Sequence, residues 1–379
     1  MQETLTQDDI QHILGTIERF AQRAVSPLVE RHEVYLQSDQ IDQLTGEAQR
    51  IGLLNLDSDE GLGLWENLSD PAVIRLSIEI LVALAEVNAG VAWHFHQLAF
   101  SRYLALRLGL GDVLAQGAGL AVIQGFYGLA RTALPRYLLG ADLTGEDREL
   151  LADYFIPQHP GVRIVFHAVD NWQWMLSPIF TGGQIAWRFL SRDEIDLEHH
   201  PHSHGLDEIP TASWKPDNDP NPSIQIDAVT SRQVYGEALQ VNALALMAVT
   251  LGAVKHGHQL AQDYAAIRYQ GGDIINRHPA MQQMLSGISA AVQICSSQLN
   301  QISLQEIALA RTGQILAVRS ALQPLLSQAA TDAVQVMGGI GYMRDIGLEK
   351  ILRDVNQLRL MHGTPGELRL FAAEWERLA

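Results

Sequence analysis

The sequence predicts an α+β fold in which helices, a small sheet and a final helical bundle follow one another along the chain. Apolar residues recur every three or four positions in residues 10–24 and again in residues 71–110, as expected for helices with one buried face. Alternation of apolar and polar residues, typical of half-buried strands, is found between residues 162 and 226. We therefore expect an N-terminal helical domain, a small β-sheet or β-barrel domain and a C-terminal four-helix bundle, over residues 1–118, 119–230 and 231–379.

Start and stop signals support the helices at both ends of the chain. The first helix is expected to begin at Thr6, whose side chain can cap it together with Asp9, and Pro27 should end or kink it. The last helix is expected to begin at Thr364. Its sequence TPGE contains a capping residue, a proline at the first helical position and a glutamate that closes a capping box.

The strands and the bundle helices can be placed individually. Alternation is clearest in VRIVFHAV at residues 162–169, in QIAWRFL at residues 184–190 and in SIQID at residues 223–227. Turn-forming residues cluster between the last two of these, as in PDNDPNP. In the bundle, residues 278–303 and 322–337 keep apolar side chains at helical spacing, which predicts two long helices.

The composition narrows the class of protein. With 379 residues, of which 47% are apolar and 18% charged, the chain is large enough for two or three domains. Its net charge of −17 disfavours sequence-independent binding to nucleic acid or to anionic lipid. The lone Cys295 fits a reducing compartment and the acidic N-terminus is unlike a signal peptide, so we expect a cytoplasmic protein. Glutamines and glycines interrupt the apolar residues 113–130, so we expect no membrane span.

The most informative motif lies near the C-terminus. Residues 330–368 read ATDAVQVMGGIGYMRDIGLEKILRDVNQLRLMHGTPGEL, which joins an apolar helix, a Gly-Gly-x-Gly break, an Arg-Asp pair and a Gly-Thr helix start. This order resembles the C-terminal signature of the acyl-CoA dehydrogenase family of flavoproteins. A second family signature is similar to the segment around Arg268, although Gly271 stands where the family has an aromatic residue. The resemblance covers most of the chain and implies the three-domain family fold with bound FAD.

The resemblance also implies which residues contact FAD. The family's arginine, here Arg268, binds the pyrophosphate, often that of a neighbouring subunit, and a guanidinium can bind two phosphate oxygens at once. Gln335 with Gly338 and Gly339 would let the backbone approach the adenosine end, since glycine allows close contact and positive φ. Thr364 would contact the flavin. Local alternatives stay open: an ordinary surface arginine, a glycine that ends a helix at Gly338, and a threonine that only caps one.

The expected base is the clearest departure from the family. Family members remove the substrate α-proton with a glutamate just before the Gly-Thr pair, where this chain has His362. A neutral imidazole can abstract a proton near pH 7, so we predict His362 as the catalytic residue. Some members carry the glutamate on the preceding long helix, where this chain has Asn242; Glu237, about one and a half turns earlier, is a poor substitute. The alternative is that His362 is only a spacer in a site that has lost its base.

Two further regions are candidates for contact with substrate or flavin. On the family fold, His94 and His96 lie on a substrate-side helix, and two residues apart they point to different faces. His96 and Asn242 are the substrate-pocket candidates. In the β domain, WQWMLSPIF supplies Trp174 and Ser177 for contact with the flavin, whereas the family's Glu-Pro-x-x-Gly-Ser-Asp stretch is absent from its expected place.

A cluster of histidines and an Arg-Asp pair have simpler interpretations. Such a cluster can bind metal, but without nearby cysteines or organised carboxylates we favour a solvated polar loop and predict no metal site. Its members are His199, His200, His202 and His204. The same loop keeps the family's Gly-Leu pair, with Asp207 in place of arginine. Arg353 and Asp354 match the family's Arg-Asp pair, and we expect them in an ion-pair network.

The sequence leaves three functions open. The leading one is FAD-dependent oxidation of an acyl thioester or a related small molecule at Cα–Cβ, with electrons passed to a partner. A flavin monooxygenase on the same scaffold would use oxygen and would not need the glutamate. A non-catalytic subunit paired with an active homologue would explain the missing glutamate and the altered β domain. For the enzyme, the resemblance implies a homodimer or a homotetramer.

Overall fold

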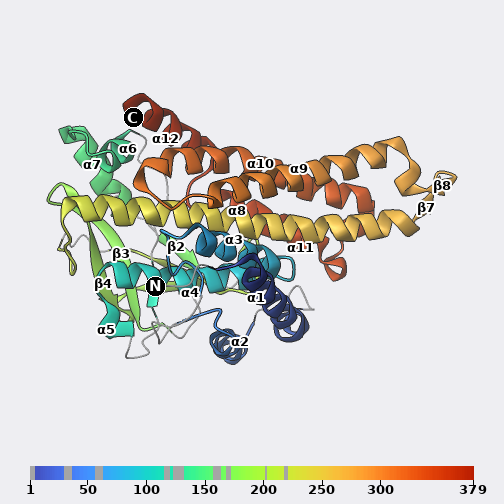
Figure 1. Cartoon of the computed structure of the whole chain (residues 1–379), viewed down its shortest axis with the longest axis horizontal. Coiled ribbons are helices and arrows are strands. Elements are labelled where there is room, and N and C mark those ends of the chain that lie inside the picture. The colour runs from blue at the N-terminus through green and yellow to red at the C-terminus, as the bar shows by residue number, and fades with distance from the viewer. Residues whose placement is uncertain are drawn as a thin grey trace.

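Long helices dominate the molecule; most strands lie towards one end of it, and a short two-stranded hairpin lies at the other (Figure 1). The computed structural model describes residues 5–29, 36–55, 63–114, 120–122, 132–156, 164–167, 172–200, 203–216 and 221–379. Helices precede the strands in the chain and longer helices follow them, which confirms the predicted α+β class. The domain limits at residues 118 and 230 stay predictions.

The N-terminal part is helical, as predicted. Its helices are α1 (Gln7–Phe20), α2 (Ser38–Arg50), α3 (Pro71–Ala85), α4 (Ala89–Arg107) and the short α5 (Gly111–Leu114). The capping box at the start of α1 is present: the Thr6 amide donates to Asp9, and the Asp9 amide donates to Thr6. After Phe20 the chain leaves α geometry and passes through a 3₁₀ turn that contains Pro27.

The middle part contains two small three-stranded sheets. The first sheet has the order β1 (Leu120–Val122), β3 (Trp174–Thr181) and β4 (Gln184–Ser191); the second has the order β2 (Ile164–His167), β6 (Thr211–Trp214) and β5 (Leu197–His200). β1 runs parallel to β3, and the other pairs are antiparallel. Met175 of the first sheet and Trp214 of the second share a small apolar core with Trp172, so the two sheets pack together.

Two predictions for this part are wrong in detail. Helices α6 (Ala133–Leu138) and α7 (Gly145–Phe155) lie within the region expected to form a small β domain, for which no helix was predicted. A capping box between Thr144 and Asp147 starts α7 and was the local signal for that helix. The segment SIQID forms only an isolated bridge between Ile224 and Trp187, because Asp227 already caps the next helix three residues later. The segment VRIVFHAV contains β2, and its residues 162, 163, 168 and 169 lie outside the described ranges.

The C-terminal part is the predicted bundle. Its helices are α8 (Ala228–Ile267), α9 (Pro279–Ser303), α10 (Thr312–Met337), α11 (Leu348–Leu360) and α12 (Pro365–Leu378). Both α8 and α10 contact α9 and α11 as well as each other, which makes a four-helix arrangement, and α12 packs on α10 (Figure 1). The two helices predicted over residues 278–303 and 322–337 are confirmed within α9 and α10.

Helix α8 is the core of the whole molecule. Within the described ranges it is the one helix that is long and apolar enough to cross a membrane. However, 94% of its most apolar window is buried, because α3, α4, α10 and α11 pack around it. This burial is typical of a core helix in a globular fold. Residues 113–130, the stretch predicted to be most apolar, lie mostly outside the described ranges.

A buried group of charges joins the middle part to α11. The Lys350 ammonium lies 2.5 Å from a carboxylate oxygen of Asp354 and 3.0 Å from one of Glu208, and all three side chains are 3–4% exposed. The Leu206 amide donates to Asp354 at 2.7 Å, and the Asn88 carboxamide donates to Glu208 at 2.8 Å. Burial raises the pKa of the Asp354 carboxyl to about 6, although Lys350 opposes the shift.

Arg353, the neighbour of Asp354 in the chain, belongs to a second group of charges. Its guanidinium binds Glu349 at 2.8 Å and also pairs with Asp207. Asp207 stands where the family has arginine, so the change of charge in the loop is matched by a partner on α11. The predicted ion-pair network is therefore confirmed, although the two members of the Arg-Asp pair bind different partners.

Candidate functional site

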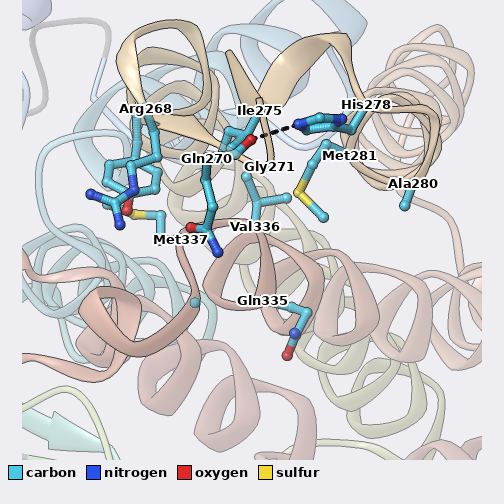
Figure 2. Close-up of a pocket in the computed structure, with 12 residues that line it drawn as sticks. Arg268, Gln270, Gly271, Ile275, His278, Ala280, Met281, Gln335, Val336 and Met337 are labelled. Atoms are coloured by element: carbon cyan, nitrogen blue, oxygen red, sulfur yellow. Dashed lines mark hydrogen bonds between the residues drawn. The ribbon is translucent and has the colours of Figure 1, made fainter. Parts of the chain in front are cut away.

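A cavity of about 360 Å³ lies where the C-terminal ends of α8 and α10 meet the start of α9. Arg268, Gln335 and Gly338 line it together, and Gly339 follows directly in the chain. Figure 2 shows Arg268 at the end of α8 and Gln335 on α10, on different sides of the cavity. The structure thus brings together residues that are 67 positions apart in the sequence and that were predicted to bind one end of FAD.

The chain turns sharply after Arg268, which caps α8 with a bond from its amide to the Tyr264 carbonyl. The strands β7 (Tyr269–Gln270) and β8 (Asp273–Ile274) are joined through Gly271, whose φ is +66°, and a second glycine. Because an aromatic side chain is strained at such a φ, this tight turn accounts for glycine at the family's aromatic position. His278 supports the turn by donating from Nε2 to the Gln270 carbonyl at 2.8 Å (Figure 2).

Gly338 ends α10 and also faces the cavity. Its φ is +63°, and its amide donates to the Gln335 carbonyl, so the helix-cap interpretation is confirmed. A Cβ atom added at Gly338 would meet no atom within 4 Å, which leaves the backbone accessible. The Arg268 guanidinium and the Gln335 carboxamide supply donors beside this open backbone, an arrangement suited to a phosphate-bearing group. The residues present therefore fit the pyrophosphate and adenosine end of FAD.

His362 lies in a different place, within a buried cluster of rings. Its ring centre is 5.7 Å from that of Trp93, which is 4.7 Å from the ring centre of His96. Trp65 meets His96 edge-on at 5.9 Å, and Phe100 stacks on it at 5.8 Å. All five side chains are buried. Trp93 thus lies next to both histidine rings, including that of the expected base.

The two substrate-pocket candidates, His96 and Asn242, bind each other. The Trp65 indole donates to Nδ1 of His96 at 3.0 Å. An indole nitrogen only donates, so the hydrogen of His96 is on Nε2, which donates to the Asn242 side-chain oxygen at 3.0 Å. The Asn242 side-chain nitrogen in turn donates to the Ala238 carbonyl. Glu237 lies elsewhere and binds Tyr103 at 2.6 Å, so α8 brings no carboxylate to the His96 side chain.

The backbone at His362 is in a conformation that non-glycine residues rarely adopt. Its φ is +52°, in the short link between α11 and α12, and Gly363 follows with a φ of +99°. Among the described residues, Trp65 and Leu206 are the only other non-glycine residues with a positive φ. Since Trp65 belongs to the same ring cluster, two of these three positions meet in one site. Such strain gathers at functional sites more often than elsewhere.

Thr364 caps α12, as predicted. The Glu367 amide donates to its hydroxyl at 3.3 Å, and the Thr364 amide donates to the Glu367 carboxylate at 2.7 Å. The hydroxyl therefore has a local partner whether or not it also contacts a flavin. Its position two residues after His362 places both near the N-terminus of α12.

Trp174 and Ser177 both lie on β3 but face opposite sides of the sheet, since they are three positions apart. The Trp174 ring stacks on Phe189 at 4.6 Å and is partly exposed. Ser177 is buried and pairs with Arg188 in the ladder. At most one of the two side chains can therefore contact a given flavin.

The histidine loop has no metal-binding arrangement in its described residues. Nowhere in the described ranges do three or more histidine, cysteine, aspartate or glutamate side chains converge as a metal site would require. The His200 ring lies 2.8 Å from the Ser213 hydroxyl, and His199 and His204 are exposed. His202 is outside the described ranges.

Sequence patterns did not reveal two residues that surround His362. The position of Trp93 could not be predicted, because apolar residues are spread around all sides of its helix and mark no single buried face. Arg319 of α10 donates to three backbone carbonyls around His362. The sequence does contain a signal for Arg319: Ile315, Leu316 and Leu322 share one helical face with it, which predicts a buried arginine.

The two candidate regions lie far apart along α10. Arg319 and Gln335 are sixteen positions apart on this helix, which corresponds to about 24 Å.

Burial keeps His94 and His96 neutral, and this predicts a loss of stability in acid. Burial lowers the pKa of each imidazole to about 4, well below the usual 6.5. The unfolded chain therefore binds protons near pH 6.5 while the native chain does not, so the stabilisation is complete above pH 6.5 and is lost as the pH falls towards 4. We expect about 2 kcal/mol of loss per histidine by pH 5.

Urea unfolding at pH 7.5 and pH 5 measures this loss. Asp354 acts in the opposite direction, because its raised pKa lets the native state bind a proton first below pH 6, but one carboxyl offsets only part of the effect of two imidazoles. The His94→Gln variant should lose less stability between the two pH values than the parent protein. An equal loss in both proteins would contradict the assignment.

The sequence of the chain was compared with those of known proteins. Residues 232–375 match the family model described as acyl-CoA dehydrogenase, C-terminal domain. This C-terminal part of the chain belongs to the acyl-CoA dehydrogenase family. Very long-chain specific acyl-CoA dehydrogenase of Rattus norvegicus is 33% identical over 132 residues, which are 34% of this chain and 20% of that relative. The 3-sulfinopropanoyl-CoA desulfinase of Paraburkholderia xenovorans is 29% identical over 126 residues, which are 32% and 31% of the two chains. The matched region thus spans about a fifth to a third of these relatives' own length.

Solved structures confirm the fold over the whole chain. Butyryl-CoA dehydrogenase from Megasphaera elsdenii aligns with a TM-score of 0.73 at 15% identity and covers 100% of both chains. The structure of PigA with FAD and proline aligns with a TM-score of 0.71 at 12% identity, again over 100% of both chains. At these identities the likeness shows the acyl-CoA dehydrogenase fold, while the reaction must be inferred from the residues of the site.

Proposed function

We propose that this acyl-CoA dehydrogenase family member is an FAD-dependent oxidoreductase that oxidises an acyl thioester or a related small molecule at Cα–Cβ. The observation that carries the proposal is the cavity in which Arg268, Gln335 and Gly338 meet, because these are the positions expected to hold one end of FAD. Bound FAD supplies an acceptor for the hydride that leaves Cβ. The protein residues bind and orient the reactants.

Proton removal is assigned to His362. It stands at the position of the family's base, is 8% exposed and lies in an apolar, aromatic environment. A neutral imidazole there can accept the proton that leaves the substrate Cα. A cytoplasmic homodimer or homotetramer, with an electron-transferring protein as acceptor, completes the proposal. The distance between the Arg268 cavity and His362 supports an oligomer in which one FAD is held by residues of two subunits.

Replacing Arg268 with glutamine tests the cofactor site. We expect the Kd for FAD to rise roughly 10- to 100-fold, since a charge-assisted hydrogen bond contributes about 1.5–3 kcal/mol. Arg277→Gln is a matched control: Arg277 lies near the same turn, is exposed and pairs with Asp273, but does not line the cavity. Its Kd should stay within about threefold of the parent value. Flavin fluorescence quenching on titration with FAD gives both constants, and equal effects of the two changes would contradict the site.

Anaerobic titration of the FAD-loaded protein with acyl-CoA thioesters of several lengths tests the reaction. Bleaching of the flavin absorbance by any of them supports the proposed oxidation. Oxygen-dependent hydroxylation without bleaching would favour a monooxygenase instead. A protein that binds no FAD would be a non-catalytic subunit, and the proposal would then be wrong.

A further inference from the structure

Arg319 is an arginine of α10 that is buried to 1% exposure in the middle of the bundle. Its guanidinium points at the link between α11 and α12. Nη1 donates to the His362 carbonyl at 2.8 Å, and Nη2 donates to the carbonyls of Met361 and, at 3.3 Å, Gly363. One side chain therefore binds three successive carbonyls, and the middle one belongs to the expected base.

Arg319 carries a buried positive charge. No ion pair of Arg319 is found within the described ranges, and its Nε has no hydrogen-bond partner there. Burial alone lowers the pKa of the guanidinium to about 9. Removing a cation from water is costly, and an exposed lysine or a glycine could complete the end of α11 without that cost. The position of the charge therefore calls for a role beyond helix capping.

The bound carbonyls belong to a strained part of the backbone. A non-glycine residue at φ +52° costs about 1 kcal/mol or more, so His362 keeps this conformation only if its surroundings hold it there. The bond to its own carbonyl and the bonds to both neighbours fix the peptide planes on either side of it. Those planes determine the direction in which the imidazole leaves the backbone towards Trp93.

We propose that Arg319 is the positioning residue for His362: its guanidinium holds the 361–363 carbonyls so that the imidazole keeps one orientation in the site. The inference rests on the proposed function for its catalytic meaning, but the orientation itself can be observed without any reaction. Arg319 does not touch the reacting atoms, and it acts through the backbone of His362.

The chain offers a closely matched control. Arg311, at the start of α10, also donates to three backbone carbonyls: that of Ile302 at 2.9 Å, that of Gln305 at 3.1 Å and that of Glu306 at 2.6 Å. It lies eight residues, or about 12 Å of helix, before Arg319. Arg311→Met thus removes the same kind of contact from a link that does not carry His362.

The test uses full-length, FAD-loaded protein with [¹³Cε1]histidine labelling, in which His362→Gln identifies the His362 resonance. In Arg319→Met we expect this resonance to shift or broaden, while it is unchanged in Arg311→Met. Under anaerobic single-turnover conditions, the maximal rate of flavin reduction per bound flavin should fall about 10- to 100-fold in Arg319→Met. The half-saturating substrate concentration should change less than about threefold. Arg319→Lys, which keeps the cation but cannot bind three carbonyls, should recover part of the rate.

Two results would overturn the inference: a His362 resonance in Arg319→Met that superimposes on the parent one, or equal changes in both arginine variants. If Arg319→Met does not fold, the same comparison is made with Arg319→Lys, for which an unchanged resonance and rate again refute the role. If no acyl thioester reduces the parent flavin, the proposed function fails. The resonance then still shows whether Arg319 sets the orientation of His362.

Discussion

Replacing Lys350 with methionine is expected to lower the free energy of unfolding by about 3–5 kcal/mol, because it leaves buried carboxylates without their cation. Lys350 is 3% exposed and lies within 3.0 Å of oxygens from both Asp354 and Glu208. The two carboxylates already exceed the single positive charge, and Glu208 keeps one buried oxygen without a hydrogen-bond partner in the described ranges. Without the ammonium, both must stay charged in an apolar place or bind protons.

The measurement is urea unfolding of both proteins at pH 7, followed by circular dichroism. Lys255→Met is the matched control, since Lys255 also pairs with a glutamate, Glu86, but both side chains are 39% exposed. That exposed pair should contribute less than about 1 kcal/mol. The deficit of Lys350→Met should shrink between pH 7 and pH 5, because a protonated Asp354 no longer repels its neighbour. Similar losses in the two lysine variants would show that the buried group does not stabilise the fold.

Replacing His362 with glutamine is expected to slow flavin reduction by about 10²- to 10⁴-fold, the usual contribution of a general base. Glutamine is similar in size and polar, so the packing against Trp93 and the bound His362 carbonyl should be kept. The variant should bind FAD as the parent does, because the Arg268 cavity lies far along the bundle. Stopped-flow absorbance under anaerobic conditions measures the rate.

Two other variants separate base chemistry from packing. His362→Glu restores the family's carboxylate at this position and should retain more activity than glutamine. His94→Gln alters another buried histidine, whose ring lies near Thr45 on α2 rather than in the site, and should change the rate by less than about threefold. A glutamine variant that reduces its flavin as fast as the parent protein would show that His362 is only a spacer.

Local signals allowed much of the fold to be predicted. The capping boxes at Thr6 and Thr364 are formed by residues three apart, so their geometry does not depend on distant parts of the chain. The capping signal at Thr144 is equally local. The helix that begins there shows that a short helix can be missed when the segments on either side alternate as strands do. The strand expected at Ile224 failed for a different reason: too few residues separate it from the cap of α8.

The candidate site divides in the same way. Arg268, Gln335 and Gly338 could be chosen from motifs because each helix end carries its own sequence signal, and these ends meet in the folded bundle. The sequence indicates His96 and Asn242 only as separate candidates, and their bond across 146 residues could not be predicted, because it depends on how α4 crosses α8. Because of that bond, the two side chains are hydrogen-bond partners of each other and do not both point freely into a pocket.

The sequence by itself determined the α+β class with helices at both ends of the chain, the resemblance to a family and the positions expected to hold FAD, because periodicity, caps and motifs are formed by neighbouring residues. Only the tertiary structure decided the surroundings of the expected base: Trp93 against its ring and Arg319 on its backbone. It also decided that Lys350 binds carboxylates from two parts of the chain. Except for the pair of Lys350 and Asp354 within α11, these contacts join segments dozens to more than two hundred residues apart. The packing of whole helices, which no local pattern specifies, decides which of these side chains meet.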